Sequence, residues 1–160
     1  MNKLKIYLDT SVISFLFATD APQFTEITKE FFVNYSNQYD LYISDIVLLE
    51  ISKNRNSELM NEMLDVTRKY GIQKLESATE IDNLAKVYIE NGIIPVNKVE
   101  DALHVGYATY YDIDILLSWN FRHLANVNKE HKIIIENLKI GYYYPLRLLS
   151  PLEVLNEITD

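Results

Sequence analysis

Short apolar segments alternate with segments of helical periodicity along nearly the whole chain. We expect strands at residues 3–8, 41–44, 72–75, 113–118 and 146–149. Helices are expected at residues 12–18, 22–35, 45–53, 57–70, 78–91, 98–110 and 128–138, and from residue 151 onward. Strands that alternate with helices pair in parallel, and the helices cover both faces of the sheet. The order of the elements therefore predicts an α/β fold around a mostly parallel sheet.

Several expected helices begin at a residue suited to capping a helix N-terminus. The candidate caps are Thr10 or Ser11, Ser44, Ser77 and Asn97. Side-chain oxygens of these types accept hydrogen bonds from the free N–H groups of the first helical turn. Glu80 follows Ser77 by three residues, which is the spacing of a capping box.

The composition excludes several classes of protein. With 160 residues, of which 48% are hydrophobic, the chain is expected to form one domain over residues 1–160. The sequence contains no cysteine and only three histidines, which excludes disulfides and thiolate metal sites and argues against structural zinc. A cytoplasmic location fits a chain without cysteine.

We expect neither a secretory leader nor a membrane span. A leader needs about 7–15 consecutive apolar residues, and Asp9 interrupts the first apolar stretch. No segment reaches the roughly 18 apolar residues of a spanning helix. The net charge of −8 argues against broad binding to nucleic acid. A nuclease remains compatible with it, because a metal ion reverses the local sign of an acidic pocket. A basic protein partner fits as well.

Polar side chains follow two of the expected strands. Asp9 ends the first strand and Asn120 follows the strand at residues 113–118. The helix before that strand runs antiparallel to it, so Asp101 near its start lies at the same edge of the sheet. Ligands and ions bind at the carboxyl ends of strands in such sheets. We therefore expect these three residues to lie close together.

A further acid, Glu50, lies in an apolar helix. It is about six residues into that helix, or roughly 9 Å along the axis. Its side chain must reach back to the edge, or the helix must cross the edge obliquely. Acids held together repel one another unless a cation lies between them. Oxygen ligands without clustered Cys or His indicate Mg²⁺ or Mn²⁺.

The chain resembles the PIN-domain family in four motifs. They are Tyr7-Leu8-Asp9-Thr10-Ser11, Val47-Leu48-Leu49-Glu50-Ile51, Glu100-Asp101-Ala102-Leu103-His104 and Leu117-Ser118-Trp119-Asn120-Phe121. Each motif alone is weak, but the four occur in the family's order and spacing. The resemblance spans nearly the whole chain and is strongest to VapC-type toxins of type II toxin–antitoxin systems.

The resemblance implies a three-layer α/β/α domain with Mg²⁺- or Mn²⁺-dependent ribonuclease activity. It implies that Asp9, Glu50 and Asp101 hold the metal and act in catalysis together with Asn120. It also implies a homodimer, and inhibition by a small antitoxin protein. The family usually has a fourth acid where this chain has Asn120. The missing charge implies weaker binding of a second metal or lower activity.

Each candidate also has a purely structural interpretation. Asp9 and Asn120 can cap helices, Asp101 suits the first turn of a helix, and Glu50 can be an exposed helix residue. Thr10 and Ser118 either orient carboxylates or act as caps. The histidines at 104 and 123 are more often structural in such positions.

Two other functions compete with the nuclease. The first is a catalytically weak PIN-like domain that acts as an RNA- or protein-binding module, as the residue at 120 suggests. The second is a phosphohydrolase that uses Asp9 as a covalent nucleophile. Such chemistry usually needs a second carboxylate two residues further on, where this chain has Ser11.

Overall fold

The computed structural model describes residues 2–159 and follows the expected alternation of strands and helices. The strands are β1 (Leu4–Leu8), β2 (Tyr39–Ser44), β3 (Gln73–Leu75), β4 (Ile115–Leu117) and β5 (Arg147–Leu149). The helices are α1 (Thr10–Ser14), α2 (Pro22–Glu30), α3 (Asp45–Ser52), α4 (Ser57–Lys69), α5 (Thr79–Glu90), α6 (Val99–Tyr110), α7 (Val127–Lys139) and α8 (Pro151–Thr159). A π-helical turn (Phe31–Tyr35) and a 3-10 turn (Ser36–Gln38) follow α2, where one continuous helix was expected.

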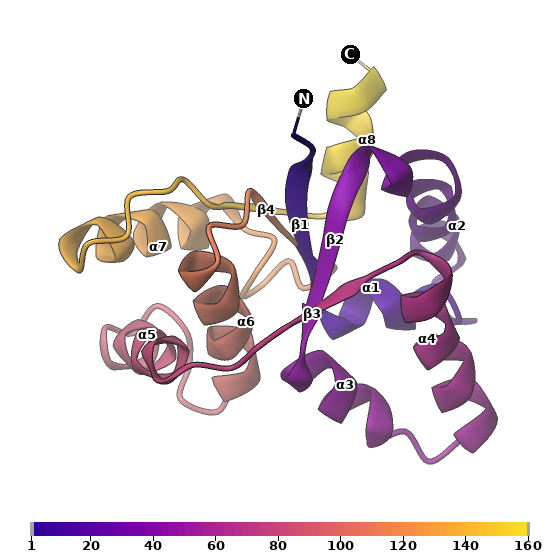
Figure 1. Ribbon diagram of the computed structural model, residues 1–160, viewed down its shortest axis with the longest axis horizontal. Helices are drawn as coiled ribbons and strands as arrows, with labels where there is room; N and C mark the ends of the chain where they lie inside the picture. Colours follow the sequence, from indigo (N-terminus) through magenta and orange to yellow (C-terminus); the bar gives the residue numbers. More distant parts are fainter. Residues whose placement is uncertain (1, 160) are drawn as a thin grey trace.

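The five strands form one sheet in the order β3-β2-β1-β4-β5, and every pair is parallel. Helices α5, α6 and α7 lie on one side of the sheet, and α1, α2 and α4 on the other (Figure 1). This arrangement confirms the expected α/β/α fold. Because β1 is the central strand, the residue after it lies at the middle of the carboxyl edge. Within residues 2–159, no helix is long and apolar enough to cross a membrane.

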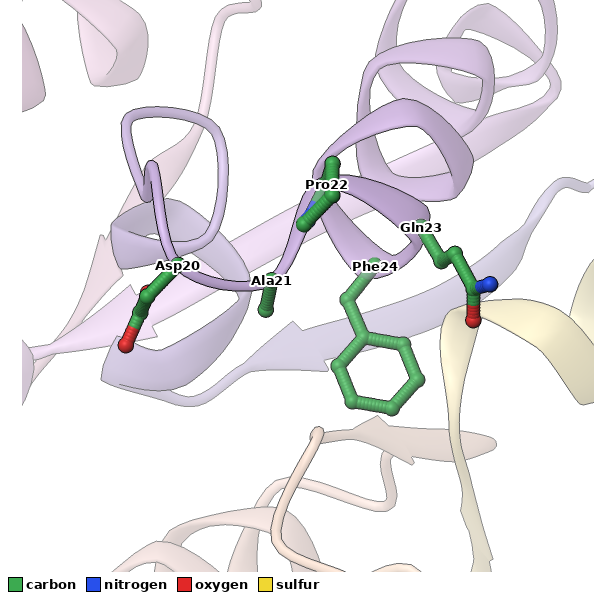
Figure 2. A pocket seen from close by; sticks show the side chains of 5 residues that line it. All are labelled: Asp20, Ala21, Pro22, Gln23 and Phe24. Carbon is green, nitrogen blue, oxygen red and sulfur yellow. The ribbon is translucent and has the colours of Figure 1, made fainter.

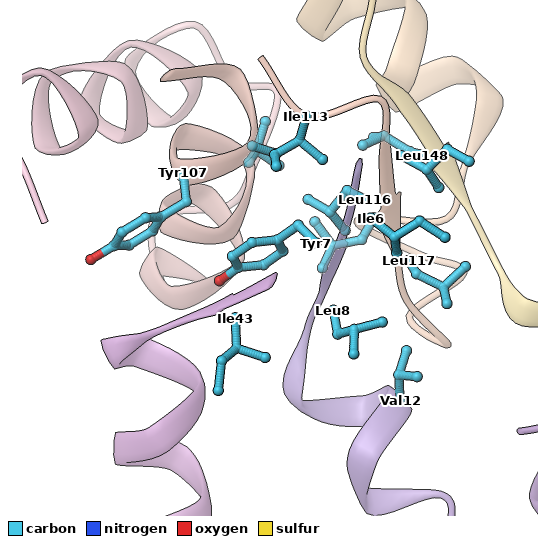
Figure 3. Close-up of a cluster of buried hydrophobic side chains, with 14 of the residues drawn as sticks. Ile6, Tyr7, Leu8, Val12, Ile43, Tyr107, Ile113, Leu116, Leu117 and Leu148 are labelled. Atoms are coloured by element: carbon cyan, nitrogen blue, oxygen red, sulfur yellow. The ribbon is translucent and has the colours of Figure 1, made fainter. Parts of the chain in front are cut away.

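The core is built on both faces of the central strands. Ile6, Tyr7 and Leu8 of β1 are all fully buried, as are Leu116 and Leu117 of β4. Figure 3 shows these side chains packed with others from the flanking elements. A parallel sheet covered on both faces needs such continuous apolar strands instead of an alternating pattern. The rigid core fixes where each strand ends, and therefore where the residues after it lie.

Several expected helix caps are wrong. Asp9, not Thr10 or Ser11, is the N-cap of α1, and its carboxylate accepts from the backbone N–H of Val12. Ala78 precedes α5 and Lys98 precedes α6, where Ser77 and Asn97 were expected. Ser44 does occupy the N-cap position of α3, but its side chain makes no capping hydrogen bond. Its hydroxyl is bonded to Tyr7 instead.

Helix α6 packs closely against its neighbour α5. A Cβ atom at Gly106 would lie 2.9 Å from the carbonyl oxygen of Ile81, which is closer than a side chain tolerates. Ala102 and Ala108 on the same helix are fully buried. These small residues let α6 pack closely against α5. Helix α6 precedes β4 and runs antiparallel to it, so the first turn of α6 lies at the carboxyl edge of the sheet.

Candidate active site at the carboxyl edge of the sheet

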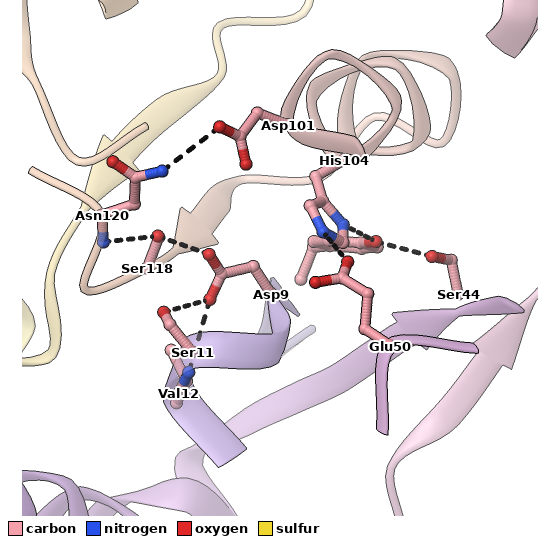
Figure 4. Close-up of polar contacts among 10 residues, drawn as sticks. Asp9, Ser11, Val12, Ser44, Glu50, Asp101, His104, Ser118 and Asn120 are labelled. Carbon is pink, nitrogen blue, oxygen red and sulfur yellow. Dashed lines mark hydrogen bonds and ion pairs between the residues drawn. The ribbon is translucent and has the colours of Figure 1, made fainter. Parts of the chain in front are cut away.

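Asp9 is the most buried carboxylate of the site, with 4% of its surface exposed. It follows β1 directly and begins α1. Its Oδ1 accepts a hydrogen bond from Ser11 Oγ at 2.6 Å, and its Oδ2 accepts one from Ser118 Oγ at 2.5 Å. Two hydroxyls from different strand ends thus hold the carboxylate in one orientation (Figure 4).

The two serines also tie the carboxylate to the loop after β4. Ser11 Oγ accepts from the backbone N–H of Trp119 at 2.9 Å. Ser118 Oγ accepts from the backbone N–H of Asn120 at 2.9 Å. Each hydroxyl donates to Asp9 and accepts from the backbone, so its single proton is committed. The expectation that Ser118 orients a carboxylate agrees with these contacts.

Asn120 connects this loop to α6. Its Oδ1 accepts from the backbone N–H groups of Arg122 and His123, at 3.2 and 3.0 Å. Only an oxygen can accept both, so the amide nitrogen faces Asp101, to which it donates at 3.3 Å. Asn120 therefore caps the following turn and orients Asp101. Asn120 stands where the family usually has an acid. This difference requires no change in the local backbone, because an aspartate could accept the same two hydrogen bonds.

Glu50 reaches the site from α3, which packs against α6. Its Oε1 lies 3.0 Å from Nε2 of His104. The Glu50 side chain is 30% exposed and that of His104 is 3% exposed. His104 follows Asp101 by three residues and so lies on the same face of α6. Glu50 lies well inside its helix and nevertheless reaches the site, because its side chain contacts a second helix, α6.

Glu50, Asp101 and Asn120 line one surface pocket of about 380 Å³. The same pocket is lined by Lys53, Asn97, Lys98 and Glu100. Asp9 lies behind it and is connected to Asn120 through Ser118. The structure therefore brings all four predicted site residues to one place. The two lysines add positive charge at the mouth of an acidic pocket.

Burial and charge act differently on the three carboxylates. Burial raises the pKa of Asp9, although His104 and the hydrogen bonds from both serines oppose the rise. Burial likewise raises the pKa of Asp101, against the opposing charge of His104. Burial also acts to raise the pKa of Glu50, but the hydrogen bond and charge of His104 outweigh it, so this pKa is lowered. The ionised forms of Asp9 and Asp101 thus have an unfavourable free energy, which a bound cation would reduce.

An aromatic cluster supports the loop after β4. Phe24 of α2 stacks on Trp119 with ring centroids 4.5 Å apart, and Phe15 and Phe121 pack at the edges of the pair. Trp119 Nε1 donates to Thr28 Oγ1 at 2.9 Å. A hollow of about 320 Å³ lies beside Phe24, lined by residues 20–24 (Figure 2). The cluster holds the loop, so that Ser118 and Asn120 face the carboxylates.

The donor set fits a hard divalent cation. Within residues 2–159, no three His, Asp or Glu side chains are already gathered tightly enough to hold a metal. Nevertheless, all the candidate donors at the pocket are oxygens, which Mg²⁺ and Mn²⁺ prefer. Oδ2 of Asp9 accepts one hydrogen bond, from Ser118, and so has a further lone pair available. The excess of acids around the pocket is the charge distribution that such an ion neutralises.

The sequence predicted no role at the site for Tyr7 or Ser11. Tyr7 is two positions before Asp9, which directly follows the strand, so both side chains point to the same face. Ser11 was considered only as a cap, yet it clamps Asp9. The strand period could have indicated Tyr7. Nothing local indicated the clamp, because its second contact is with Trp119, more than a hundred residues away.

Fold and site together define a class: an α/β/α protein with an acidic pocket at the carboxyl edge of a parallel sheet. A family model described as the PIN domain matches residues 6–130. The chain therefore belongs to the PIN domain family, which confirms the resemblance in the sequence motifs. Members of this family are generally nucleases, and they typically use divalent metal ions.

Two solved structures share the fold. One is VapBC2 from Rickettsia felis bound to a DNA fragment from their promoter, with TM-score 0.58 and 15% identity, covering 92% of this chain and 98% of that chain. The other is VapBC-1 from nontypeable Haemophilus influenzae, with TM-score 0.52 and 15% identity, covering 83% of this chain and 94% of that chain. A comparison with curated proteins gives no significant match.

Proposed function

We propose that this protein is a metal-dependent endoribonuclease that hydrolyses RNA phosphodiester bonds, and that it acts as a VapC-like toxin. The observation that carries the proposal is the convergence of three carboxylates in a PIN domain. Glu50 of α3 and Asp101 of α6 line one pocket, and Asp9, directly after β1, lies behind it and is connected to it through Ser118 and Asn120. Asp9, Glu50 and Asp101 would hold Mg²⁺ or Mn²⁺. When bound there, such an ion activates water and stabilises charge in phosphodiester hydrolysis.

Residues of the chain itself have separate tasks in this proposal. Ser11 and Ser118 keep the carboxylate of Asp9 directed at the site through bonds of 2.6 and 2.5 Å. Asn120 orients Asp101. Lys53 and Lys98, which line the same pocket, would bind phosphates of the RNA. These lysines give an acidic protein a local surface for RNA.

Partners and location are part of the same proposal. We propose a small antitoxin protein as inhibitor, because the two similar structures are both VapBC assemblies. The net charge of −8 favours basic segments in that partner. A homodimer, a single domain over residues 1–160 and a cytoplasmic location remain predictions of the family resemblance.

Cleavage of a mixed RNA pool with Mn²⁺, with Mg²⁺ and with EDTA tests the nuclease. We expect cleavage by the wild type with either metal, no cleavage in EDTA, and loss of cleavage in Asp9→Ala and Asp101→Asn. Glu62→Gln is the control, because Glu62 is an exposed acid on α4 and lies outside the pocket. Unchanged cleavage in Asp9→Ala would refute the mechanism.

A protein that binds RNA at every metal concentration but never cleaves it would establish the alternative, a binding module. Cleavage by Asn120→Asp, in contrast to the wild type, would then place the defect at Asn120, where the family's fourth acid is missing.

A further inference from the structure

A chain of buried polar side chains leads from the interior of the protein to Glu50. Ser44 Oγ lies 2.7 Å from the hydroxyl of Tyr7, and that hydroxyl lies 2.6 Å from Nδ1 of His104. Nε2 of His104 then lies 3.0 Å from Glu50. The first two residues are fully buried, and His104 is 2% exposed. The four residues belong to β2, β1, α6 and α3, so the chain connects four elements (Figure 4).

The direction of the last hydrogen bond follows from the chemistry of its partners. Glu50 is a carboxylate at the partly exposed end of the chain, and its Oε1 lies 3.0 Å from Nε2 of His104. An ionised carboxylate can only accept, so Nε2 of His104 carries a proton and donates to it. This holds whether Nδ1 accepts from Tyr7 or donates to it. In either case Tyr7 and Ser44 fix the plane of the imidazole.

His104 also lies on the face of α6 that carries Asp101, which precedes it by three residues. Both of its ring nitrogens have side-chain partners, Tyr7 and Glu50. Fully buried polar groups are costly unless each is satisfied, and here the satisfied chain ends at a carboxylate of the pocket.

We propose that His104 is the positioning residue of Glu50, and that Tyr7 and Ser44 hold its imidazole in place. The inference rests on the proposed function, in which Glu50 is a metal ligand. Residues that orient a ligand from behind change metal affinity by about 10–100-fold when removed. The proposal gives a role to Tyr7, which neither the metal site nor the RNA surface otherwise needs.

The fold offers a matched control for Tyr7. Tyr88 is also fully buried and bonded to two side chains, Thr109 Oγ1 at 3.0 Å and Asn137 Oδ1 at 2.6 Å. Its network joins α5, α6 and α7 and contains no carboxylate. Loss of the hydroxyl from either tyrosine removes two buried hydrogen bonds. Only the loss from Tyr7 should reach the metal site.

The test is the Mn²⁺ affinity of the intact protein, measured by calorimetry and by the electron paramagnetic resonance signal of free Mn²⁺. We expect Tyr7→Phe to bind Mn²⁺ about tenfold more weakly than wild type. Tyr88→Phe should bind within about twofold of wild type, because its network is separate from the pocket. Equal Mn²⁺ affinities for the two variants would overturn the proposal.

A second pair of variants tests the donated bond itself. A glutamine amide reaches the position of Nε2, whereas an asparagine amide reaches only that of Nδ1. His104→Gln should therefore retain most of the Mn²⁺ affinity, and His104→Asn should lose about tenfold or more. If both bind as wild type does, His104 has only a packing role. Should either variant fail to fold, the tyrosine pair decides the question.

Failure of the inference is distinct from failure of the proposed function. If the wild type binds no Mn²⁺, both are overturned. If the wild type binds Mn²⁺ and Asp9→Ala does not, but Tyr7→Phe binds normally, only the inference is overturned. Long-range ¹H–¹⁵N spectra of the imidazole add a readout independent of metal. We expect the His104 Nδ1 signal to shift in Tyr7→Phe and to stay unchanged in Tyr88→Phe.

Discussion

The sheet has an aspartate at each end of its central strands, and the two residues have different surroundings. Asp114 precedes β4 at the amino end, where its Oδ2 accepts from the backbone N–H of Lys5 at 2.7 Å and its Oδ1 from the Tyr144 hydroxyl at 2.5 Å. Asp9 follows β1 at the carboxyl end and lies among other acids. Burial raises the pKa of Asp9, against the effects of His104 and two serines.

The difference separates a structural carboxylate from a binding one. Asp114 joins two parts of the fold, because it accepts hydrogen bonds from a backbone N–H of β1 and from a side chain in the segment before β5. Asp9 lies beside a pocket with two further acids, and burial makes the ionised forms of Asp9 and Asp101 costly. Acids with shifted pKa values are often found at functional sites. We therefore assign a structural role to Asp114 and propose a ligand-binding role for Asp9.

The largest expected difference between the two ends is in metal binding. Asp9→Asn should weaken Mn²⁺ binding and metal-dependent cleavage about a hundredfold or more, because it removes a charged ligand. Asp114→Asn should leave both unchanged within about twofold, because sites without shared partners act independently. Calorimetry and the cleavage assay measure the two effects. Equal losses in the two variants would show that the ends do not differ in this way.

An acid added at residue 120 should increase the difference in metal binding between the two ends of the sheet. Asn120→Asp restores a fourth carboxylate and can accept the same hydrogen bonds from residues 122 and 123. We expect about tenfold tighter Mn²⁺ binding, because ligand charge sets affinity for hard cations. The variant should also unfold at lower temperature in EDTA, because a further acid faces Asp101. Weaker Mn²⁺ binding would mean that the amide is needed to orient Asp101.

The affinity for Mn²⁺ should depend on pH over an unusually high range. Burial raises the pKa of Asp9 and of Asp101, so both take up protons at a higher pH than an exposed aspartate near 3.9. A protonated carboxyl does not bind the ion, and affinity therefore decreases as pH falls through these raised values. Titrations with Mn²⁺ from neutral pH downward measure this. An affinity that decreases only at about pH 3.9, as expected for an exposed aspartate, would contradict the raised pKa values.

Without metal, the same substitution should have different effects on stability at the two ends. A pKa raised by folding means that the folded state favours the protonated acid, so ionised Asp9 costs stability at neutral pH, and this cost is relieved as pH falls through the raised pKa. Asp9→Asn in EDTA should therefore gain less stability than wild type does when the pH is lowered, each compared with its own value at neutral pH. Asp114→Asn should be less stable by about 1 kcal/mol, since it loses a hydrogen-bond acceptor. Thermal unfolding in EDTA at several pH values is the measurement, and a wild-type pH dependence in Asp9→Asn would contradict the raised pKa of Asp9.

The smallest expected effect is on RNA binding at the carboxyl edge. Lys98→Ala should lower the salt dependence of RNA affinity by about 0.7 in the log–log slope, which corresponds to one phosphate contact. Lys86→Ala on α5 is the control, because Lys86 is exposed and lies outside this pocket. Fluorescence anisotropy in EDTA at several salt concentrations measures the slope. Identical slopes for the two variants would remove Lys98 from the RNA surface.

Sequence reasoning located the fold and the place of the site. The alternation of strands and helices, and the continuous apolar strands, predicted a parallel sheet covered on both faces, which is confirmed. Parallel strands end at one edge, so the sequence alone predicted that Asp9, Asp101 and Asn120 lie close together. That they act as ligands or in catalysis stays a prediction.

Local patterns failed where tertiary contacts compete for the same atoms. Serine is a common helix cap, but the hydroxyls of Ser11 and Ser44 are hydrogen-bonded to Asp9 and Tyr7. The helix over residues 22–35 changes to a π-helical turn where Phe31 and Phe32 become buried. Capping rules describe one helix end, whereas these residues respond to neighbours far away in the chain.

The sequence by itself determined the order of elements, the apolar core and the edge at which the acids gather, because each depends on periodicity and on strand direction. Only the tertiary structure decided which atoms meet. The clamp of Ser11 and Ser118 on Asp9, and the contact of Glu50 with His104, join segments up to 109 residues apart. Such contacts depend on how helices of two layers pack across the sheet, and no local pattern encodes that packing.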